Sequence, residues 1–429
     1  MISTWVRTTF SALGDPHYRV LWAGTTLAFL AFAMSNVVQS VVAYDLTGKN
    51  GDVGIVALGM GVATIVTAPF GGVIADRVSK RGLLLVGQTT IAADFMLVGV
   101  LIVTDHITIP LLVASTFVLG LVFSFIAPAR QAWIGELLHG PRLPNGIALQ
   151  QVAMTSTRIV GPFLAGALVA LPFIASGGTY VFMGALIVLV VATLAQLPPS
   201  APRQRAEGHS ALADFREGLE HVAARPSLTL LAVSFIGVVI AGYSYQVVLP
   251  GYLTDELGRS SKDVAWLLGI AGFAGLVVTV GVAGMAGSRY AWRLMGMGGV
   301  VLGIGLIGLS LAGNFAVALV VMLLVGAGSS SYQLLNSALL VQESDPAYYG
   351  RVMSLTMLAW GFNGLAGLPF GLLADATGER PTLLVMGVAV LTITAASGAA
   401  RKVIGPTRAT RPPLTGEATR TTDPARTHP

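Results

Sequence analysis

Long apolar runs recur along this 429-residue chain, each bounded by short polar breaks. A helix needs about 20 predominantly apolar residues to cross a bilayer. Because lipid offers no hydrogen-bond partners, such runs cross as helices whose backbone groups pair internally. The sequence therefore predicts an all-α polytopic membrane protein with twelve transmembrane helices. The predicted helices lie near residues 20–44, 53–75, 82–104, 109–129, 147–171, 179–197, 228–250, 263–285, 292–313, 315–340, 352–374 and 381–400.

The composition argues against several other classes of protein. Hydrophobic residues make up 54% of the chain and charged residues 10%, whereas soluble domains carry about 25% charged residues. Cysteine is absent and the histidines fall in loops or tails without metal-binding spacing, so we expect no metal site and no cofactor. One dinucleotide-like pattern, Gly303-Ile-Gly305-Leu-Ile-Gly308, lies inside a predicted membrane helix with no preceding strand. Enzyme motifs are otherwise absent, so an enzyme is not expected.

Positive charges are distributed unevenly among the polar segments. If the N-terminus is cytoplasmic, the segments on that side hold 20 of the 25 Lys and Arg residues. The outer loops hold only Lys49, Arg259, Lys262 and Arg380. Cytoplasmic loops of membrane proteins carry such an excess of cations. The pattern predicts a multi-pass protein of the plasma (cytoplasmic, or cell inner) membrane with both termini cytoplasmic. The same bias explains the net charge of +5, which therefore does not indicate nucleic acid binding.

The longest internal polar break divides the chain into two halves. Within it, Leu212, Phe215, Leu219 and Val222 recur at helical spacing among charged residues, which predicts an amphipathic helix on the cytoplasmic face. The predicted parts are an N-terminal cytoplasmic segment 1–19 (a short interfacial helix or a tail), a six-helix bundle 20–197, the linker 198–227, a second six-helix bundle 228–403 and a disordered cytoplasmic tail 404–429.

Two opposite charges are predicted inside spans. Asp94 lies about 18 Å from the cytoplasmic start of the third helix, and Arg158 lies at a similar depth in the fifth. Either charge alone is costly in the bilayer. Three interpretations stay open: a proton- or substrate-linked pair, a fixed ion pair, or two charges that never meet and each face water. Gln151 and Thr155 share a helix face with Arg158, which favours a cavity-facing position for that residue.

Other polar side chains recur along single faces of the predicted helices. They indicate either a substrate cavity or hydrogen bonds between helices. The candidate cavity residues are Asn36, Gln39, Gln151, Thr155, Tyr243, Gln246, Gln333, Asn336, Trp360 and Asn363.

One polar interruption, Gly72-Val-Ile-Ala-Asp76-Arg77-Val-Ser-Lys80-Arg81, separates the second and third predicted helices. Its charges cannot lie in hydrocarbon, so we expect a tight loop at the membrane surface. The pattern resembles the signature loop of the major facilitator superfamily of secondary transporters, with Ser79 in place of the usual glycine. Further segments are similar to the enterobactin-exporter-like branch of siderophore and drug exporters. These are Tyr18-Arg-Val-Leu-Trp22, Tyr44-Asp-Leu-Thr-Gly48, Pro128-Ala-Arg-Gln131 with Leu143-Pro-Asn145, and Gly350-Arg-Val-Met-Ser354.

The fifth predicted helix contains Gly161, Pro162 and Gly166. Proline removes a backbone hydrogen bond and kinks a helix, and glycines permit bending and close packing. The run is therefore a candidate helix hinge, and it resembles the fifth-helix motif of exporters in the same superfamily.

The resemblance implies two pseudo-symmetric bundles that rock around a midplane site, which is alternating access. By this resemblance, Asp76 meets the N-terminal end of the eleventh helix, near residues 351–354, when the cytoplasmic side is closed. The expected gate residues are Gly72, Asp76, Arg77, Lys80, Arg81 and Arg130. Arg77 and Arg81 are expected to hold the loop through carboxylates or lipid headgroups. Glu136 in a neighbouring loop is expected to pair with Arg77 or Arg130.

The expected function is a secondary active transporter: a monomeric, proton-coupled antiporter that performs efflux of a small amphipathic drug or siderophore. Its partners are the lipid bilayer, the small molecule and protons, with Asp94 as the candidate proton carrier because it is the carboxylate placed in a span interior. The alternatives are a lipid or lysolipid translocator of the same fold and a non-transporting membrane sensor or scaffold.

Overall fold

The computed structural model describes residues 11–140, 142–200, 211–345 and 348–404. The side chains of residues 68–69, 71–77, 211–215, 283, 349–351 and 353–357 lie outside that description. Within the described ranges the protein is helical and contains no strand. The long helices are α2 (Pro16–Thr47), α3 (Asn50–Arg77), α4 (Lys80–Val103), α5 (Ile109–Leu137), α6 (Arg142–Ala170), α7 (Ala175–Ala195), α9 (Pro226–Tyr243), α11 (Val264–Ala283), α12 (Ala291–Leu311), α13 (Phe315–Glu343), α14 (Tyr349–Thr377) and α15 (Glu379–Ile404).

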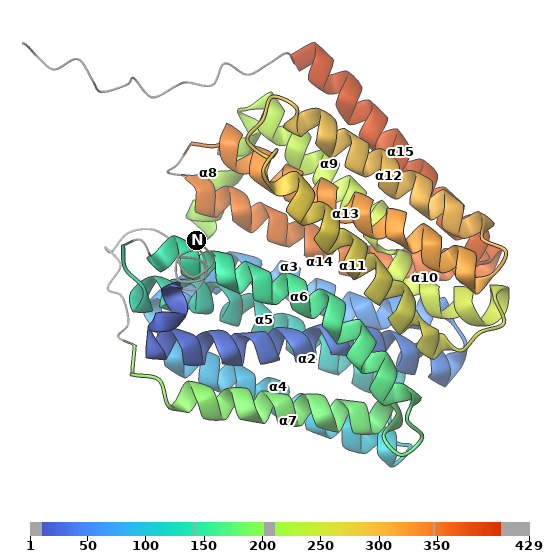
Figure 1. Ribbon diagram of the computed structural model, residues 1–429, viewed down its shortest axis with the longest axis horizontal. Coiled ribbons are helices and arrows are strands. Elements are labelled where there is room, and N and C mark those ends of the chain that lie inside the picture. Colours follow the sequence, from blue (N-terminus) through green and yellow to red (C-terminus); the bar gives the residue numbers. More distant parts are fainter. Residues whose placement is uncertain (1–10, 141, 201–210, 346–347, 405–429) are drawn as a thin grey trace, which may run out of the picture.

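The predicted spans are confirmed as helices. Eleven of the described segments are long and apolar enough to cross a membrane. The twelfth span corresponds to α14, which is 29 residues long. Figure 1 shows the two bundles, with α2 to α7 in one and α9 to α15 in the other, and their long axes converge toward the end that holds α10 (Tyr245–Gly251).

Side chains cap the starts of several helices, and the first of these helices begins before its predicted apolar run. Asp15 accepts a hydrogen bond from the backbone N–H of Tyr18 at 2.9 Å, so α2 begins at Pro16. In the predicted N-terminal segment 1–19, residues 11–14 form a single 3₁₀ turn and residues 16–19 belong to α2, while residues 1–10 lie outside the described residues. The Asn314 side chain accepts from Val317 N–H at 3.0 Å and separates α13 from α12.

The seventh span is broken, whereas the sequence predicted one continuous helix over 228–250. The helix ends at Tyr243 and resumes at Tyr245, and a π-helical turn follows over Tyr252–Glu256. At the break, the Ser244 hydroxyl donates to the carbonyl oxygen of Ile240 at 2.7 Å. Such side-chain bonds compete with the helix ladder and bend helices, and Pro250 removes a further donor.

The amphipathic linker helix is present as α8 (Ala211–Ala223). Its surface carries an ion pair between Arg216 and Glu220, one helical turn apart at 2.8 Å. It contacts α3 of one bundle and α9 and α14 of the other. The predicted tail after residue 404 lies outside the described residues.

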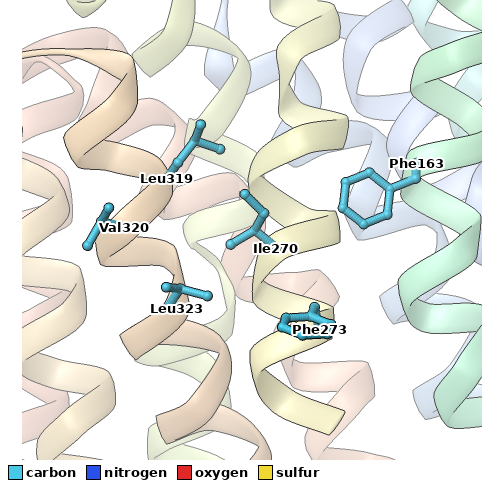
Figure 2. A pocket seen from close by; sticks show the side chains of 6 residues that line it. All are labelled: Phe163, Ile270, Phe273, Leu319, Val320 and Leu323. Carbon is cyan, nitrogen blue, oxygen red and sulfur yellow. The ribbon is translucent and has the colours of Figure 1, made fainter. Parts of the chain in front are cut away.

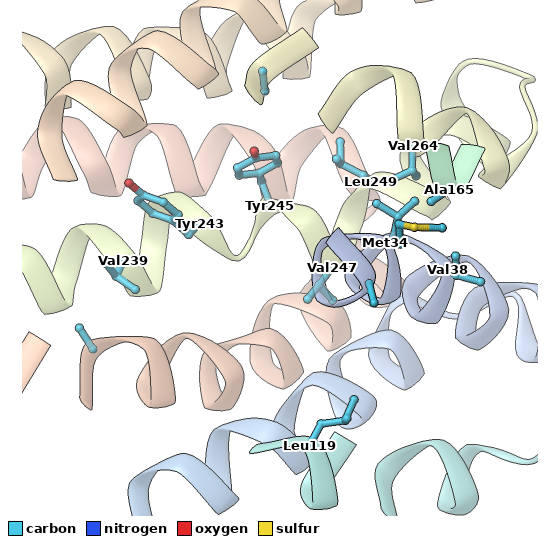
Figure 3. Close-up of a cluster of buried hydrophobic side chains, with 14 of the residues drawn as sticks. Met34, Val38, Leu119, Ala165, Val239, Tyr243, Tyr245, Val247, Leu249 and Val264 are labelled. Carbon is cyan, nitrogen blue, oxygen red and sulfur yellow. The ribbon is translucent and has the colours of Figure 1, made fainter. Parts of the chain in front are cut away.

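The two bundles meet along α3 with α14 and along α6 with α11. Glycines make the first contact possible: a Cβ on Gly61 would lie 2.7 Å from the carbonyl oxygen of Gly361, and one on Gly54 would overlap that of Gly367. Small residues let the backbones of membrane helices approach this closely. Apolar side chains fill the same junction; Figure 3 shows Met34 of α2 together with buried residues of α10 and α11.

Candidate functional site

One end of the molecule is sealed by polar contacts between the bundles, and we call it the closed end. It holds residues 44–51, 252–263 and 375–380. There the Asp375 carboxylate, at the end of α14, accepts from the backbone N–H groups of Asn50 and Gly51 at 2.7 and 2.8 Å. These are the first residues of α3. A carboxylate at a helix N-terminus satisfies unpaired donors and complements the helix dipole.

Two side-chain bonds join α2 to the other bundle at the same end. The Tyr44 hydroxyl donates to the Asp255 carboxylate at 2.9 Å. The Ser261 hydroxyl donates to the carboxylate of Asp45 at 2.6 Å. Together with the Asp375 contacts, these bonds link both α2 and α3 to the second bundle.

A buried amide–carboxylate contact completes the closed end. The side-chain amide of Asn50 donates to Glu379 at 2.8 Å, and both residues are buried. Neither Asp375 nor Glu379 is among the expected gate residues. The spacing Gly371-Leu-Leu-Ala-Asp375 matches that of Gly72 and Asp76, but on the sequence alone it is a weak echo of that loop and does not predict a second copy of the cytoplasmic gate.

At the opposite end, the side chains of Gly72, Asp76 and Arg77 lie outside the described residues. The buried Lys80 ammonium pairs with Glu136 at 2.7 Å, and among the described side chains no ion pair joins Glu136 to Arg130. The other expected partner of Glu136, Arg77, lies outside the described side chains. Lys80 is the first residue of α4, and its side chain is buried. The sequence does not show which cation of this loop is buried, so it could not identify Lys80 as the partner of Glu136.

Two further residues of the expected gate, Arg81 and Arg130, have partners that the sequence did not indicate. The Arg81 guanidinium donates to the carbonyl oxygens of Ala195, at 2.6 Å, and Leu194, at 3.4 Å. These carbonyls lie at the C-terminus of α7, where a cation is favoured by the helix dipole. Among the described residues, the partners of the Arg81 guanidinium are therefore backbone carbonyls and not carboxylates. Arg130 is buried, with its guanidinium carbon 5.0 Å from the ring centroid of Phe29.

Arg158 faces the space between the bundles, near the middle of α6. Its guanidinium donates to the side-chain oxygen of Gln333 on α13 at 3.4 Å and lies 5.8 Å from the ring centroid of Trp360 on α14. Tyr243 packs edge-on against Trp360, with ring centroids 5.3 Å apart. Its hydroxyl donates to the carbonyl oxygen of Ser329 at 2.7 Å. Residues from four helices therefore meet around one cation.

Asp94 lies elsewhere, against α5. Its carboxylate accepts a hydrogen bond from the Ser115 hydroxyl at 2.7 Å. Among the described residues no ion pair joins Asp94 to Arg158. The two charges therefore do not pair in this structure. Arg158 is exposed, as the third interpretation requires, whereas Asp94 is partly buried and bound to Ser115.

The remaining candidate cavity residues divide by burial. Asn336 is fully buried, and its amide donates to the carbonyl oxygen of Leu231 at 3.1 Å, so it belongs to the core between α9 and α13. This corrects its assignment to the cavity: it lies three residues from Gln333, which on a helix of 3.6 residues per turn displaces it toward α9. Asn363 contacts Ser244, with 3.2 Å between its side-chain oxygen and the serine hydroxyl oxygen. The other candidates are exposed or partly exposed: Asn36, Gln39, Gln151, Thr155 and Gln246.

The predicted hinge residues lie within an unbroken helix, α6, which continues through Pro162. A Cβ on Gly161 would lie 2.6 Å from the Cβ of Ala33, and one on Gly166 would overlap Ala265 of α11. The structure therefore shows Gly161 and Gly166 as positions of close helix packing, and Gly166 is a contact between the bundles.

An apolar groove of about 420 Å³ lies between α6, α11 and α13, and Figure 2 shows its six lining side chains. These are Phe163, Ile270, Phe273, Leu319, Val320 and Leu323. Phe273 and Val320 are 55% and 65% exposed. A groove lined by exposed apolar side chains suits contact with lipid hydrocarbon rather than with a polar solute.

Solved membrane transporters share the two-bundle fold of this chain. One similar solved structure is a bacterial homologue of the human lysosomal transporter Spinster in an inward-facing, unoccupied conformation (TM-score 0.75, 14% identity, 92% of this chain and all of that chain covered). Another is the nucleoside transporter NupG (TM-score 0.70, 13% identity, 90% and 98% covered).

The chain belongs to the Major Facilitator Superfamily, whose family profile matches residues 21–367. Similar curated proteins include the uncharacterised MFS-type transporter YfiS of Bacillus subtilis, 24% identical with 83% of this chain and 86% of that protein covered. The staphyloferrin A transporter of Staphylococcus aureus is 21% identical, with 78% and 83% covered. The enterobactin exporter EntS of Shigella flexneri is 25% identical, with 88% and 92% covered. The resemblance inferred from residues 72–81 is thereby confirmed, and the protein is a membrane transporter, not an enzyme.

Proposed function

We propose that this transporter is a proton-coupled exporter of a small amphipathic molecule, that it works by alternating access, and that the structure is its inward-facing state. The observation that carries the proposal is the closed end. Bonds between the bundles seal it at Asp375, Tyr44 and Asp45, while Arg158 stays exposed midway along the helices. The cation bias of the loops supports a closed end outside the cell and both termini in the cytoplasm.

The names of the relatives support a cargo of this kind. They include a staphyloferrin A transporter, an enterobactin exporter and a macrolide efflux protein. The test is a substrate panel in proteoliposomes with an imposed pH gradient. Uptake of a panel member into inside-out vesicles, driven by an acidic lumen, supports export by proton antiport. Flux that does not depend on the pH gradient contradicts proton coupling.

Asp94 is the proposed proton carrier, with Ser115 as its hydrogen-bond donor. Replacing Asp94 with Asn keeps an acceptor for Ser115 but removes the titrating group. We expect gradient-driven flux to be abolished while exchange of substrate down its own gradient continues. A Ser115→Ala variant serves as the control, because it removes the hydrogen bond and keeps the carboxyl group. If the Asp94→Asn variant keeps its gradient-driven flux, Asp94 is not the residue that couples transport to protons.

Asp76 is the proposed gate at the cytoplasmic end. By the family resemblance it stabilises the closed cytoplasmic side at the N-terminus of α14, an interaction of roughly 0.3–2 kcal/mol. Replacing Asp76 with Asn should slow transport and leave expression and substrate binding largely intact. The check is initial flux at matched protein amounts. If Asp76→Asn transports at the wild-type rate, Asp76 is not part of the gate.

A lipid or lysolipid translocator is the second candidate, and the apolar groove between α6, α11 and α13 favours it. Fluorescent lysolipid flux in the same proteoliposomes distinguishes it from an exporter of small solutes. A non-transporting sensor would show flux of neither kind.

A further inference from the structure

Arg158 is a cation held midway along the fold without a compensating acid. Among the described residues its hydrogen-bond partner is the neutral Gln333, and no carboxylate lies within ion-pair distance. Asp94, the carboxylate at mid-helix, is bound to Ser115. A guanidinium carries five N–H donors in a planar fork, so most of its donors stay available to a ligand.

Arg158 lies at a point where its helix, α6, contacts α11 of the other bundle. A Cβ on Gly272 of α11 would lie 3.0 Å from the carbonyl oxygen of Arg158, so α6 and α11 touch at this level. Gln333 and Trp360 approach the side chain from α13 and α14. A ligand bound to the guanidinium would therefore contact both bundles, which is the position that allows binding to influence their rocking.

The walls beside the guanidinium are aromatic. Trp360 lies within cation–π distance of it, and Tyr243 packs edge-on against that indole. The Tyr243 hydroxyl is bound to the carbonyl oxygen of Ser329, so the ring is held in place. The site thus combines one guanidinium group with a fixed aromatic surface.

We propose that Arg158 is the anion-binding residue of the transport site, and that the cargo is an organic anion with a carboxylate next to an aromatic or other apolar body. The carboxylate pairs with the guanidinium fork, which matches its two oxygens. Gln333 orients the fork, and Trp360 contacts the apolar body. A cationic cargo is disfavoured because it would face an unneutralised arginine. The inference rests on the proposed transport function and specifies its substrate class.

The test compares matched probes that differ only in charge. They are 2-naphthoate, 2-naphthamide and 2-naphthylmethylammonium, with the biphenyl and indole counterparts of each. Binding is measured by equilibrium dialysis on the purified, full-length protein in detergent, without a gradient. We expect saturable binding of at least one carboxylate, with its amide and ammonium counterparts at least tenfold weaker. Arg158→Gln should weaken the carboxylate roughly ten- to 150-fold, as the loss of a charge-assisted hydrogen bond does.

Two variants act as controls. Arg158→Lys keeps the charge without the fork and should retain part of the affinity. Arg216→Gln removes a surface charge on α8 and should bind as the wild type does. Equal affinity in Arg158→Gln, preference for the ammonium probes, or no saturable carboxylate binding would overturn the anion site. Failure of the transport proposal is separate: it would appear as carboxylate binding without flux in proteoliposomes.

Discussion

Replacing Gly54 with Leu is expected to hold the closed end open and to reduce transport severely. Gly54 packs against the backbone of Gly367 and Leu368, and even a Cβ would overlap the Gly367 carbonyl oxygen. Backbone atoms of two helices cannot move aside for a side chain, so the added atoms separate α3 from α14. Overpacking of this kind costs about 1–3 kcal/mol, which shifts the balance between states by about five- to 150-fold.

The measurement is initial flux, together with thiol labelling of a single cysteine introduced at the closed end. The chain has no native cysteine, so only the introduced cysteine can be labelled. Gly296→Leu on α12 is the matched control, because a Cβ there meets nothing within 4 Å. If Gly54→Leu transports as the control does, the α3–α14 contact is not a gate. Both proteins should show the same thermal unfolding temperature to within a few degrees, which separates gating from misfolding.

Removing the Asp375 carboxylate is expected to weaken the same end by loss of its polar contacts. Asp375→Ala leaves the N–H groups of Asn50 and Gly51 without their acceptor, whereas Asp375→Asn keeps one neutral acceptor. A charge at a helix N-terminus contributes about 0.3–2 kcal/mol, so the closed population should fall about two- to thirtyfold. Flux should decrease in the order wild type, Asn, Ala.

Asp52→Asn is the control for the charge alone. Asp52 lies in the same first turn of α3, and no hydrogen bond joins its side chain to the second bundle among the described residues. Its replacement should change flux little. If Asp52→Asn and Asp375→Asn behave alike, the effect comes from the dipole of α3 and not from the contact between the bundles.

The spans and the division into bundles could be predicted from the sequence because each depends on local composition. An apolar run of spanning length forms a helix wherever it lies in the bundle. The start of α2 depends on a single cap, Asp15, and the break in the seventh span coincides with one side-chain bond, from the Ser244 hydroxyl. Periodicity does not report such individual bonds.

The partners of the site residues could not be predicted because they come from distant helices. The depth of Arg158 and its polar stripe favoured a cavity-facing side chain, and its partners Gln333 and Trp360 come from the second bundle. The same depth placed Asp94 at a similar level, but rotation about α4 turns it to Ser115 on α5. The Gly371-x-x-x-Asp375 repeat was visible in the sequence, yet its role appears only where α14 ends beside the start of α3.

Alternating access is the central claim, and spin-label distances at the two ends test it most directly. One pair, Lys49→Cys with Lys262→Cys, spans the closed end, and the other, His139→Cys with Arg289→Cys, spans the opposite end; all four positions are exposed. Adding Gly54→Leu should lengthen the first distance and shorten the second. Unchanged distances, or a change of both in the same direction, would contradict the account.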